Sequence, residues 1–246
     1  MKRGHVLRRH LHNERRTPHS ALGADHVAVI EGRTRFPKRV IHPDFVPRLL
    51  KSGHNNQKIG AEVQRGAWRG FPIYTLTLEE RATCPSSCAH WFDCFGNKMH
   101  WPARHMHGKA LELRLIDEVA GLARKHPGGF LVRLHVLGDF YDLRYPALWA
   151  ALSDAVPALH VYGYTGWRPD TPVGRLLTHA RFHSRGRFAI RFSNAPREEW
   201  STRTHYGDAG NVDDGIVCPA QLEASECCST CGLCWGSPRR IVFLAH

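Results

Sequence analysis

The chain has 246 residues, 42% of them hydrophobic, which is enough to bury a core in one large domain, or in a medium domain with an appendage, without covalent staples. No apolar run reaches the roughly 18 residues of a membrane span, and no hydrophobic stretch follows the basic start, so we expect a cytoplasmic protein with no secretory signal and no membrane partner. The net charge of +12 indicates a polyanionic partner, DNA or RNA.

The basic charge is concentrated in residues 1–70, which we expect to be an irregular segment. They hold 15 Lys and Arg against 5 Asp and Glu, a difference of +10, which leaves +2 for the other 176 residues. Such a segment either binds nucleic acid or is a solvated tail. In the first interpretation its phosphate contacts come from Arg8, Arg9, Arg15 and Arg16.

Residues 71–210 alternate between strand and helix patterns, and we interpret them as an α/β catalytic domain. The alternation predicts parallel strands joined by helical crossovers, arranged as a partial or complete (β/α) barrel. In chain order, the expected elements are strand 72–78, helix 104–125, strand 130–137, helix 145–156, strand 159–165, helix 173–183 and strand 188–194. The apolar stripe of the first helix consists of Leu111, Leu115, Val119 and Leu122.

Residues of distinctive chemistry follow the carboxyl end of each expected strand, where parallel sheets and barrels gather their function. Asp139, after the second strand, could act as base, nucleophile or amine ligand, or could simply form a turn beside Gly138. Trp167 and Arg168, after the third, could stack on a base and bind a phosphate, or could serve packing. Asn194, after the fourth, is a further candidate cofactor contact. This convergence favours an enzyme.

Arg133 and His135 alternate with apolar neighbours on the second strand, so we expect both side chains to point the same way, into a barrel. A buried arginine there needs an anionic partner. The two residues are therefore candidate catalytic groups, with an internal salt bridge as the alternative.

Cys84, Cys88 and Cys94 form a C-x3-C-x5-C loop directly after the first strand. A closed zinc site needs a fourth ligand, which His90 or His100 could supply. A 4Fe–4S cluster held by three cysteines would instead leave one iron open. In a reducing compartment, clustered cysteines favour metal ligation over disulfides.

A strand, a three-cysteine loop and a helix in this order are similar to radical S-adenosylmethionine enzymes. Their usual spacing is C-x3-C-x2-C with an aromatic before the third cysteine, whereas here the last gap is longer and Asp93 takes that position. The resemblance implies a 4Fe–4S cluster and S-adenosylmethionine. It also implies that Gly138 and Asp139, in "LGDF", contact that cofactor.

Residues 211–246 carry a second cysteine group, which predicts a metal knuckle at the C-terminus. Four soft ligands suit zinc or a second 4Fe–4S cluster equally well, and the site could be structural or catalytic. A redox disulfide through one C-x2-C pair is a third interpretation, and Cys227 could replace its neighbour as a ligand. The expected ligands are Cys218, Cys228, Cys231 and Cys234.

The combination of "LLKSGHNNQKIG", "TCPSSC…CFGN", "RLHVLGDFY" and "CPAQ…CSTCGLCW" resembles the gene-product-88 family of phage and plasmid proteins. The resemblance runs from about Leu49 to Trp235. It implies a phage- or plasmid-encoded protein in a bacterial cytoplasm. Some phage relatives are linked to 7-deazaguanine DNA modification, which would imply Asp139 as a carboxylate nucleophile and a structural zinc.

Three functions are consistent with these patterns. The first is an iron–sulfur enzyme, similar to radical S-adenosylmethionine proteins, that modifies a nucleic-acid base. The second is a zinc-stabilised transglycosylase that exchanges a guanine base in DNA. The third is a zinc-knuckle nucleic-acid-binding protein without enzymatic activity.

Overall fold

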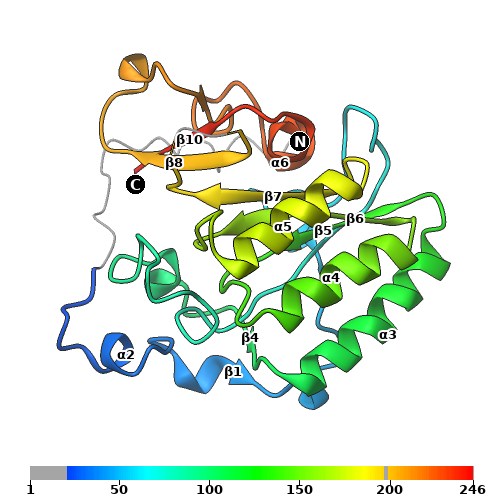
Figure 1. Ribbon diagram of the computed structural model, residues 1–246, viewed down its shortest axis with the longest axis horizontal. Coiled ribbons are helices and arrows are strands. Elements are labelled where there is room, and N and C mark those ends of the chain that lie inside the picture. The colour runs from blue at the N-terminus through cyan, green and yellow to red at the C-terminus, as the bar shows by residue number, and fades with distance from the viewer. Residues whose placement is uncertain (1–20, 197–198, 246) are drawn as a thin grey trace.

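The computed structural model describes residues 21–196 and 199–245, so Arg8, Arg9, Arg15 and Arg16 lie outside the described residues (Figure 1). Its centre is one eight-stranded sheet in the order β2-β3-β5-β6-β7-β8-β10-β9, and every neighbouring pair except β2–β3 is parallel. The predicted α/β class with parallel strands is therefore confirmed. The strands are β2 (Lys51–Ser52), β3 (Ile73–Thr75), β5 (Phe130–Leu134), β6 (Leu159–Thr165), β7 (Phe188–Ser193), β8 (Ser201–His205), β9 (Ile216–Val217) and β10 (Ile241–Leu244).

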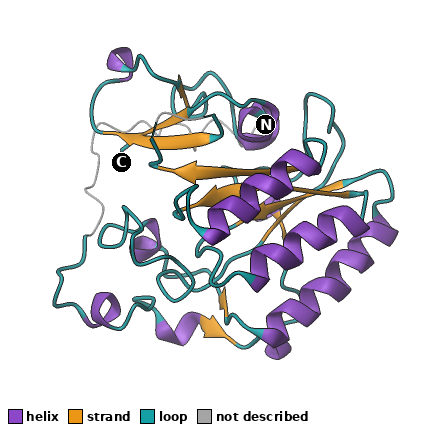
Figure 2. Cartoon of the chain, in the orientation of Figure 1, coloured by secondary structure: helices purple, strands orange, loops and turns teal. Residues whose placement is uncertain are grey.

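Three long helices cover one face of this sheet (Figure 2). The predicted stripe of the first helix is confirmed, because Leu111, Leu115 and Val119 are fully buried in the core. The third helix starts one residue before the predicted start, with the Thr171 hydroxyl accepting a hydrogen bond from the Gly174 N–H at 3.1 Å. The helices are α3 (Lys109–Lys125), α4 (Arg144–Ala155) and α5 (Pro172–His183).

The C-terminal segment packs on the opposite face, which we call the inner face. It contains the short helices α6 (Cys228–Cys231) and α7 (Leu233–Gly236). The Trp235 ring meets the Tyr162 ring of β6 edge-on at 4.7 Å and belongs to a second core cluster. The sheet is thus covered on both sides, which explains the nearly continuous apolar runs of its central strands.

Residues 21–70 form short pieces that dock onto this framework. The carboxylate of Glu118 on α3 accepts hydrogen bonds from the N–H groups of Leu49, at 2.8 Å, and Leu50, at 2.9 Å. Ile59 and Val63 belong to the core cluster of the inner face. These pieces are α2 (Val27–Ile30), η1 (Pro37–Arg39), β1 (Val40–Ile41), η2 (Pro43–Phe45) and η3 (Gly53–Asn55).

Three predicted boundaries are wrong by three residues or more. Strand β3 ends at Thr75, three residues before the predicted end. The first helix begins at Lys109, not at residue 104, because Gly108 has φ +120°, which an α-helix cannot contain. Arg104 instead lies on β4 (Arg104–His105), which pairs with β1. Strand β5 ends at Leu134, three residues before the predicted end. Within the residues that the structure describes, no helix combines the length and apolar character needed to cross a membrane.

Candidate metal and active site

The cysteine loop, Asp139 and the end of β6 meet at the carboxyl ends of three neighbouring strands. Burial, and then the nearby charges of Asp139, Cys88 and Cys94, raise the pKa of the Cys84 thiol. A Cβ atom added to Gly166, directly after β6, would lie 3.4 Å from Cys88 Sγ and 3.5 Å from Asp139 Oδ2. The three thiols, which we call the loop group, therefore lie near one another, and Cys84 and Cys88 are the two close to the carboxylate.

Asp139 is almost fully buried, and four hydrogen bonds to backbone N–H and side-chain hydroxyl groups fix its position. Its Oδ1 accepts hydrogen bonds from the Phe140 N–H at 2.7 Å and the Thr165 hydroxyl at 2.8 Å. Its Oδ2 accepts one from the Gly166 N–H at 2.6 Å, and its own N–H donates to the Thr83 hydroxyl at 3.0 Å. A carboxylate offers about four acceptor positions, and these hydrogen bonds occupy three of them, two on Oδ1 and one on Oδ2.

Burial raises the pKa of Asp139 to about 7, although its three hydrogen bonds oppose the shift. In the metal-free protein, the unfolded chain then loses this proton at a lower pH than the folded chain. The free energy of unfolding should therefore fall as pH rises between about 4 and about 7, by at most ~4 kcal/mol. Asp139→Asn should lose this dependence and be the more stable protein above that window. Urea unfolding across the window tests this, and parallel curves for the two proteins would contradict it.

Two buried arginines hold the cysteine loop in shape. The Arg81 guanidinium donates to the Trp91 carbonyl at 2.9 Å and to Asn97 Oδ1 at 2.6 Å. Arg104 and Glu80 form an ion pair at 2.6 Å with both side chains fully buried. The loop thus depends on buried charged groups at its base, together with the packing of Trp91 against Leu22, Ala28 and Val29.

The loop group has the donor chemistry of a site for a soft metal or an iron–sulfur cluster. Burial raises the pKa of Cys94 to about 11, so this thiol releases its proton when a metal binds. In the parts of the chain that the structure describes, no three His, Cys, Asp or Glu side chains already stand where they could hold a metal ion. Binding would therefore have to draw the thiols together.

Of the two histidines considered as a fourth zinc ligand, one has hydrogen-bond partners on both ring nitrogens and the other packs against an aromatic ring. His90 Nδ1 lies 3.0 Å from Asp93 Oδ1, and His90 Nε2 lies 3.0 Å from Asn194 Nδ2. His100 packs edge-on against Phe36, with ring centroids 5.8 Å apart. Both ring nitrogens of His90 are thus partnered, and Asn194 reaches the cysteine loop through this histidine.

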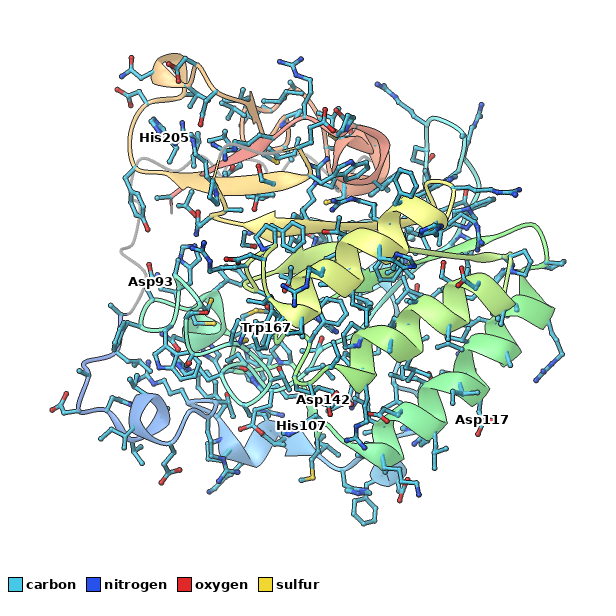
Figure 3. All side chains as sticks on the ribbon, viewed as in Figure 1. Asp93, His107, Asp117, Asp142, Trp167 and His205 are labelled. Carbon is cyan, nitrogen blue, oxygen red and sulfur yellow. The ribbon has the colours of Figure 1, made fainter. Side chains whose placement is uncertain are left out.

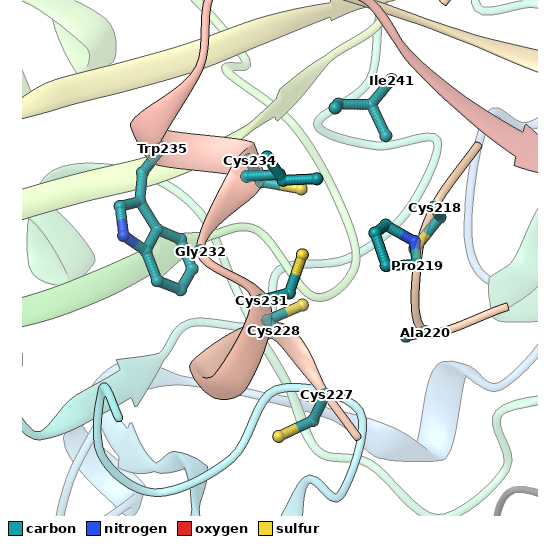
Figure 4. A pocket seen from close by; sticks show the side chains of 11 residues that line it. Cys218, Pro219, Ala220, Cys227, Cys228, Cys231, Gly232, Cys234, Trp235 and Ile241 are labelled. Carbon is teal, nitrogen blue, oxygen red and sulfur yellow. The ribbon is translucent and has the colours of Figure 1, made fainter. Parts of the chain in front are cut away.

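The second cysteine group lines a small cavity on the inner face of the sheet (Figure 4). Figure 4 shows the sulfurs of Cys228 and Cys231 on the side of this cavity that faces Cys218, whereas the Cys227 sulfur points away. Cys227 Sγ lies instead 3.1 Å from Ser229 Oγ. The geometry thus favours Cys228 over Cys227. We call Cys218, Cys228, Cys231 and Cys234 the C-terminal group.

The segment "QKIG" holds this group against the sheet. The Lys58 and Ile59 carbonyls each accept a hydrogen bond at 2.9 Å, from the N–H groups of Cys228 and Ser229 respectively. Gly60 has φ +88°, and a Cβ there would lie 2.3 Å from Ser229 Oγ. A glycine is needed at this position both for its backbone conformation and for the close approach.

Arg133 and His135 do not point the same way, so that prediction is wrong. The Arg133 guanidinium lies on the inner face, 4.8 Å from the Tyr164 ring centroid. His135 lies among the helices, where its Nε2 is 3.1 Å from the Tyr145 hydroxyl and burial lowers its pKa to about 3. Strand β5 ends at Leu134, so the alternation of a strand does not extend to His135.

Trp167 and Arg168 lie in different environments, although they are neighbours in sequence. The Trp167 indole N–H donates to the Phe140 carbonyl at 2.7 Å, and its ring packs against the core (Figure 3). Arg168 is exposed and pairs with Asp170 at 3.2 Å. The structure thus places Trp167 in packing next to the site and leaves Arg168 at the surface.

Sequence reasoning missed the residues that support the ligands. Thr83, Thr165 and Gly166 contact Asp139, and the Glu80–Arg104 pair fixes the loop. The sequence held one signal for Glu80. It belongs to a run of charged residues that lies directly between the apolar strand pattern and the cysteine loop. Arg104 had no such signal, because its partner lies 24 residues away in sequence.

Comparison with known proteins adds no relative. No model of a known protein family, no curated protein and no solved structure matches the chain.

Proposed function

We propose that this chain is an iron–sulfur enzyme, similar to radical S-adenosylmethionine enzymes, that modifies a base in a nucleic acid. The observation that carries the proposal is the meeting of the loop group with Asp139 and Gly166 at the carboxyl ends of β3, β5 and β6. The parallel strands would be those of a partial barrel, with the C-terminal group as a second metal knuckle. A three-cysteine cluster, when bound, would supply one-electron chemistry at an iron that no protein side chain ligates.

The residues around the loop group have different roles in the proposed site. Asp139 holds the end of β6 against the cysteine loop and keeps one acceptor position on Oδ2 for a bound amine or hydroxyl. Its pKa of about 7 also suits a group that takes up a proton near neutral pH. Gly166 keeps the space beside Cys88 open. The engagement of His90 favours three thiols over a closed zinc site.

A nucleic-acid substrate is supported by exposed aromatic and basic groups among the described residues. Trp101 is 77% exposed, and the Arg39 guanidinium lies 5.7 Å from its ring centroid. Lys38 and Arg39 lie in the last turn of η1. An exposed ring beside cations is the arrangement with which proteins stack unpaired bases and hold phosphates.

Anaerobic purification, metal analysis and an absorption spectrum test the proposal. We expect broad visible absorbance and several irons per chain, and the absorbance should change when S-adenosylmethionine is added. A colourless protein with one or two zinc ions would overturn the proposal. It would favour base exchange at Asp139, which an assay with a labelled deazaguanine base would then test.

A further inference from the structure

Three cations lie beside the C-terminal group on the inner face of the sheet, one fully buried, one half-buried and one exposed. They are Lys58, Arg133 and Arg191, and within the described ranges none of them forms an ion pair with a carboxylate. Removing a charge from water without a counter-charge costs several kcal/mol, so buried cations are normally paired. The half-buried Arg133 and the fully buried Arg191 therefore call for an anion at the same place, and the exposed Lys58 adds to the positive charge around it.

Two of the cations adjoin the group. The Lys58 carbonyl accepts a hydrogen bond from the Cys228 N–H at 2.9 Å, and the Arg133 guanidinium lies 4.8 Å from the ring centroid of Tyr164, whose hydroxyl contacts Cys234 Sγ. Burial lowers the pKa of Lys58, and the repulsion from Arg133 adds to this, whereas the charges of Cys218 and Cys228 oppose it. Burial also acts to lower the pKa of Arg133, but neighbouring Tyr and Cys groups, Cys228 among them, raise it overall. The Arg133 Nε atom is buried without a hydrogen-bond partner in the described part of the chain.

The third cation holds the ligand segment itself. The Arg191 guanidinium donates to the Cys234 carbonyl at 2.8 Å and to the Leu233 carbonyl at 3.0 Å. Tyr164, on the neighbouring strand, donates its hydroxyl to Cys234 Sγ at 2.9 Å. The group therefore lies beside positively charged side chains, and one of its sulfurs accepts a hydrogen bond.

Metal ligation by cysteine supplies the missing anion. Cysteine binds metals as a thiolate, so four thiolates on one divalent ion leave two negative charges uncompensated. The described residues place no carboxylate in ion-pair contact with these cations, which leaves the thiols as the anion source next to Lys58 and Arg133.

We infer that Lys58, Arg133 and Arg191 supply the counter-charge of an anionic four-thiolate metal centre formed by the C-terminal group, and that Tyr164 stabilises one of its thiolates. The inference rests on the proposed metal-binding function of this group and assigns these four residues a positioning role toward it.

The test measures Zn²⁺ affinity of the full chain by competition with a chromophoric chelator. A Cys88→Ala background restricts binding to the C-terminal group. In Arg133→Met and Lys58→Met, we expect affinity to fall about 10- to 100-fold, as for other residues that support metal ligands. Arg133→Lys, which keeps the charge, should stay close to the background protein. Lys51→Met is the matched control, because Lys51 is exposed on β2.

Unfolding of the metal-free proteins distinguishes an electrostatic role toward the metal from a contribution of these side chains to core packing. Because the cations are uncompensated without metal, Arg133→Met should unfold at the same or a higher urea concentration. Unchanged Zn²⁺ affinity in both Met variants would overturn the inference while leaving the metal centre intact. If Cys231→Ala does not reduce the Zn²⁺ bound in the same background, the group is not a metal centre, and the inference fails with it.

Discussion

Replacing Cys88 with alanine is expected to abolish metal binding at the loop group, and with it the proposed enzymatic activity, while the fold persists. The side chain is partly exposed and faces Gly166 and Asp139, so its loss should cost only on the order of 1 kcal/mol of unfolding free energy. The backbone bond from the Cys88 N–H to the Pro85 carbonyl, 2.9 Å, does not depend on the thiol. Metal content and absorbance measure the loss of metal, and circular dichroism measures the persistence of the fold.

Ser87→Ala is the matched control, because Ser87 is exposed on the same loop. It should keep the metal content and absorbance of the wild type. If Cys88→Ala unfolds the chain, the loop is a structural clasp and the proposed active site is wrong. If the variant keeps the iron content of the loop group, Cys88 is not a ligand.

The substitution Glu80→Gln should destabilise the protein by about 3–5 kcal/mol, because it leaves the buried Arg104 without its counter-charge. Both side chains are fully buried, and Arg104 donates to both Glu80 oxygens, at 2.6 and 2.9 Å. The Thr34 hydroxyl also donates to Oε1 at 2.7 Å. Since domains are stable by only about 5–15 kcal/mol, this loss is a large share of the total.

Urea unfolding measures this cost, with Asp170→Asn as the control. Asp170 and its partner Arg168 are both exposed, so this pair is screened by water and its loss should not shift the unfolding midpoint. The Glu80 variant should also take up less metal at the loop group, because Arg104 donates to the Met99 carbonyl beside the loop. Equal midpoints for the two variants would show that the buried pair does not support the fold.

The strands and helices that the sequence predicted correctly are those with a strong local pattern. Strand β6 (Leu159–Thr165) has its predicted bounds, and α5 (Pro172–His183) starts one residue early. The errors occur where a contact distant in sequence decides the conformation. Residue 104 fits the periodicity of the following helix, but Arg104 is held by Glu80 and by the pairing of β4 with β1.

The candidate ligands could be listed from the sequence, but their surroundings could not. Cysteine spacing indicated two metal-binding groups, and the position of Asp139 after a buried strand marked it as a site residue. Whether Cys227 or its neighbour faces the other thiols depends on how "QKIG" pairs with the segment, which no local pattern encodes.

By itself, the sequence determined the α/β class, the parallel strands and the residue types of the site, because hydrophobic periodicity and thiol spacing are local properties of the chain. Only the tertiary structure decided which charges become buried together. It placed Arg133 and Arg191 beside the C-terminal group and Glu80 against Arg104. Burial and pairing of charges arise from segments far apart in sequence, and their free energy depends on the water that folding removes.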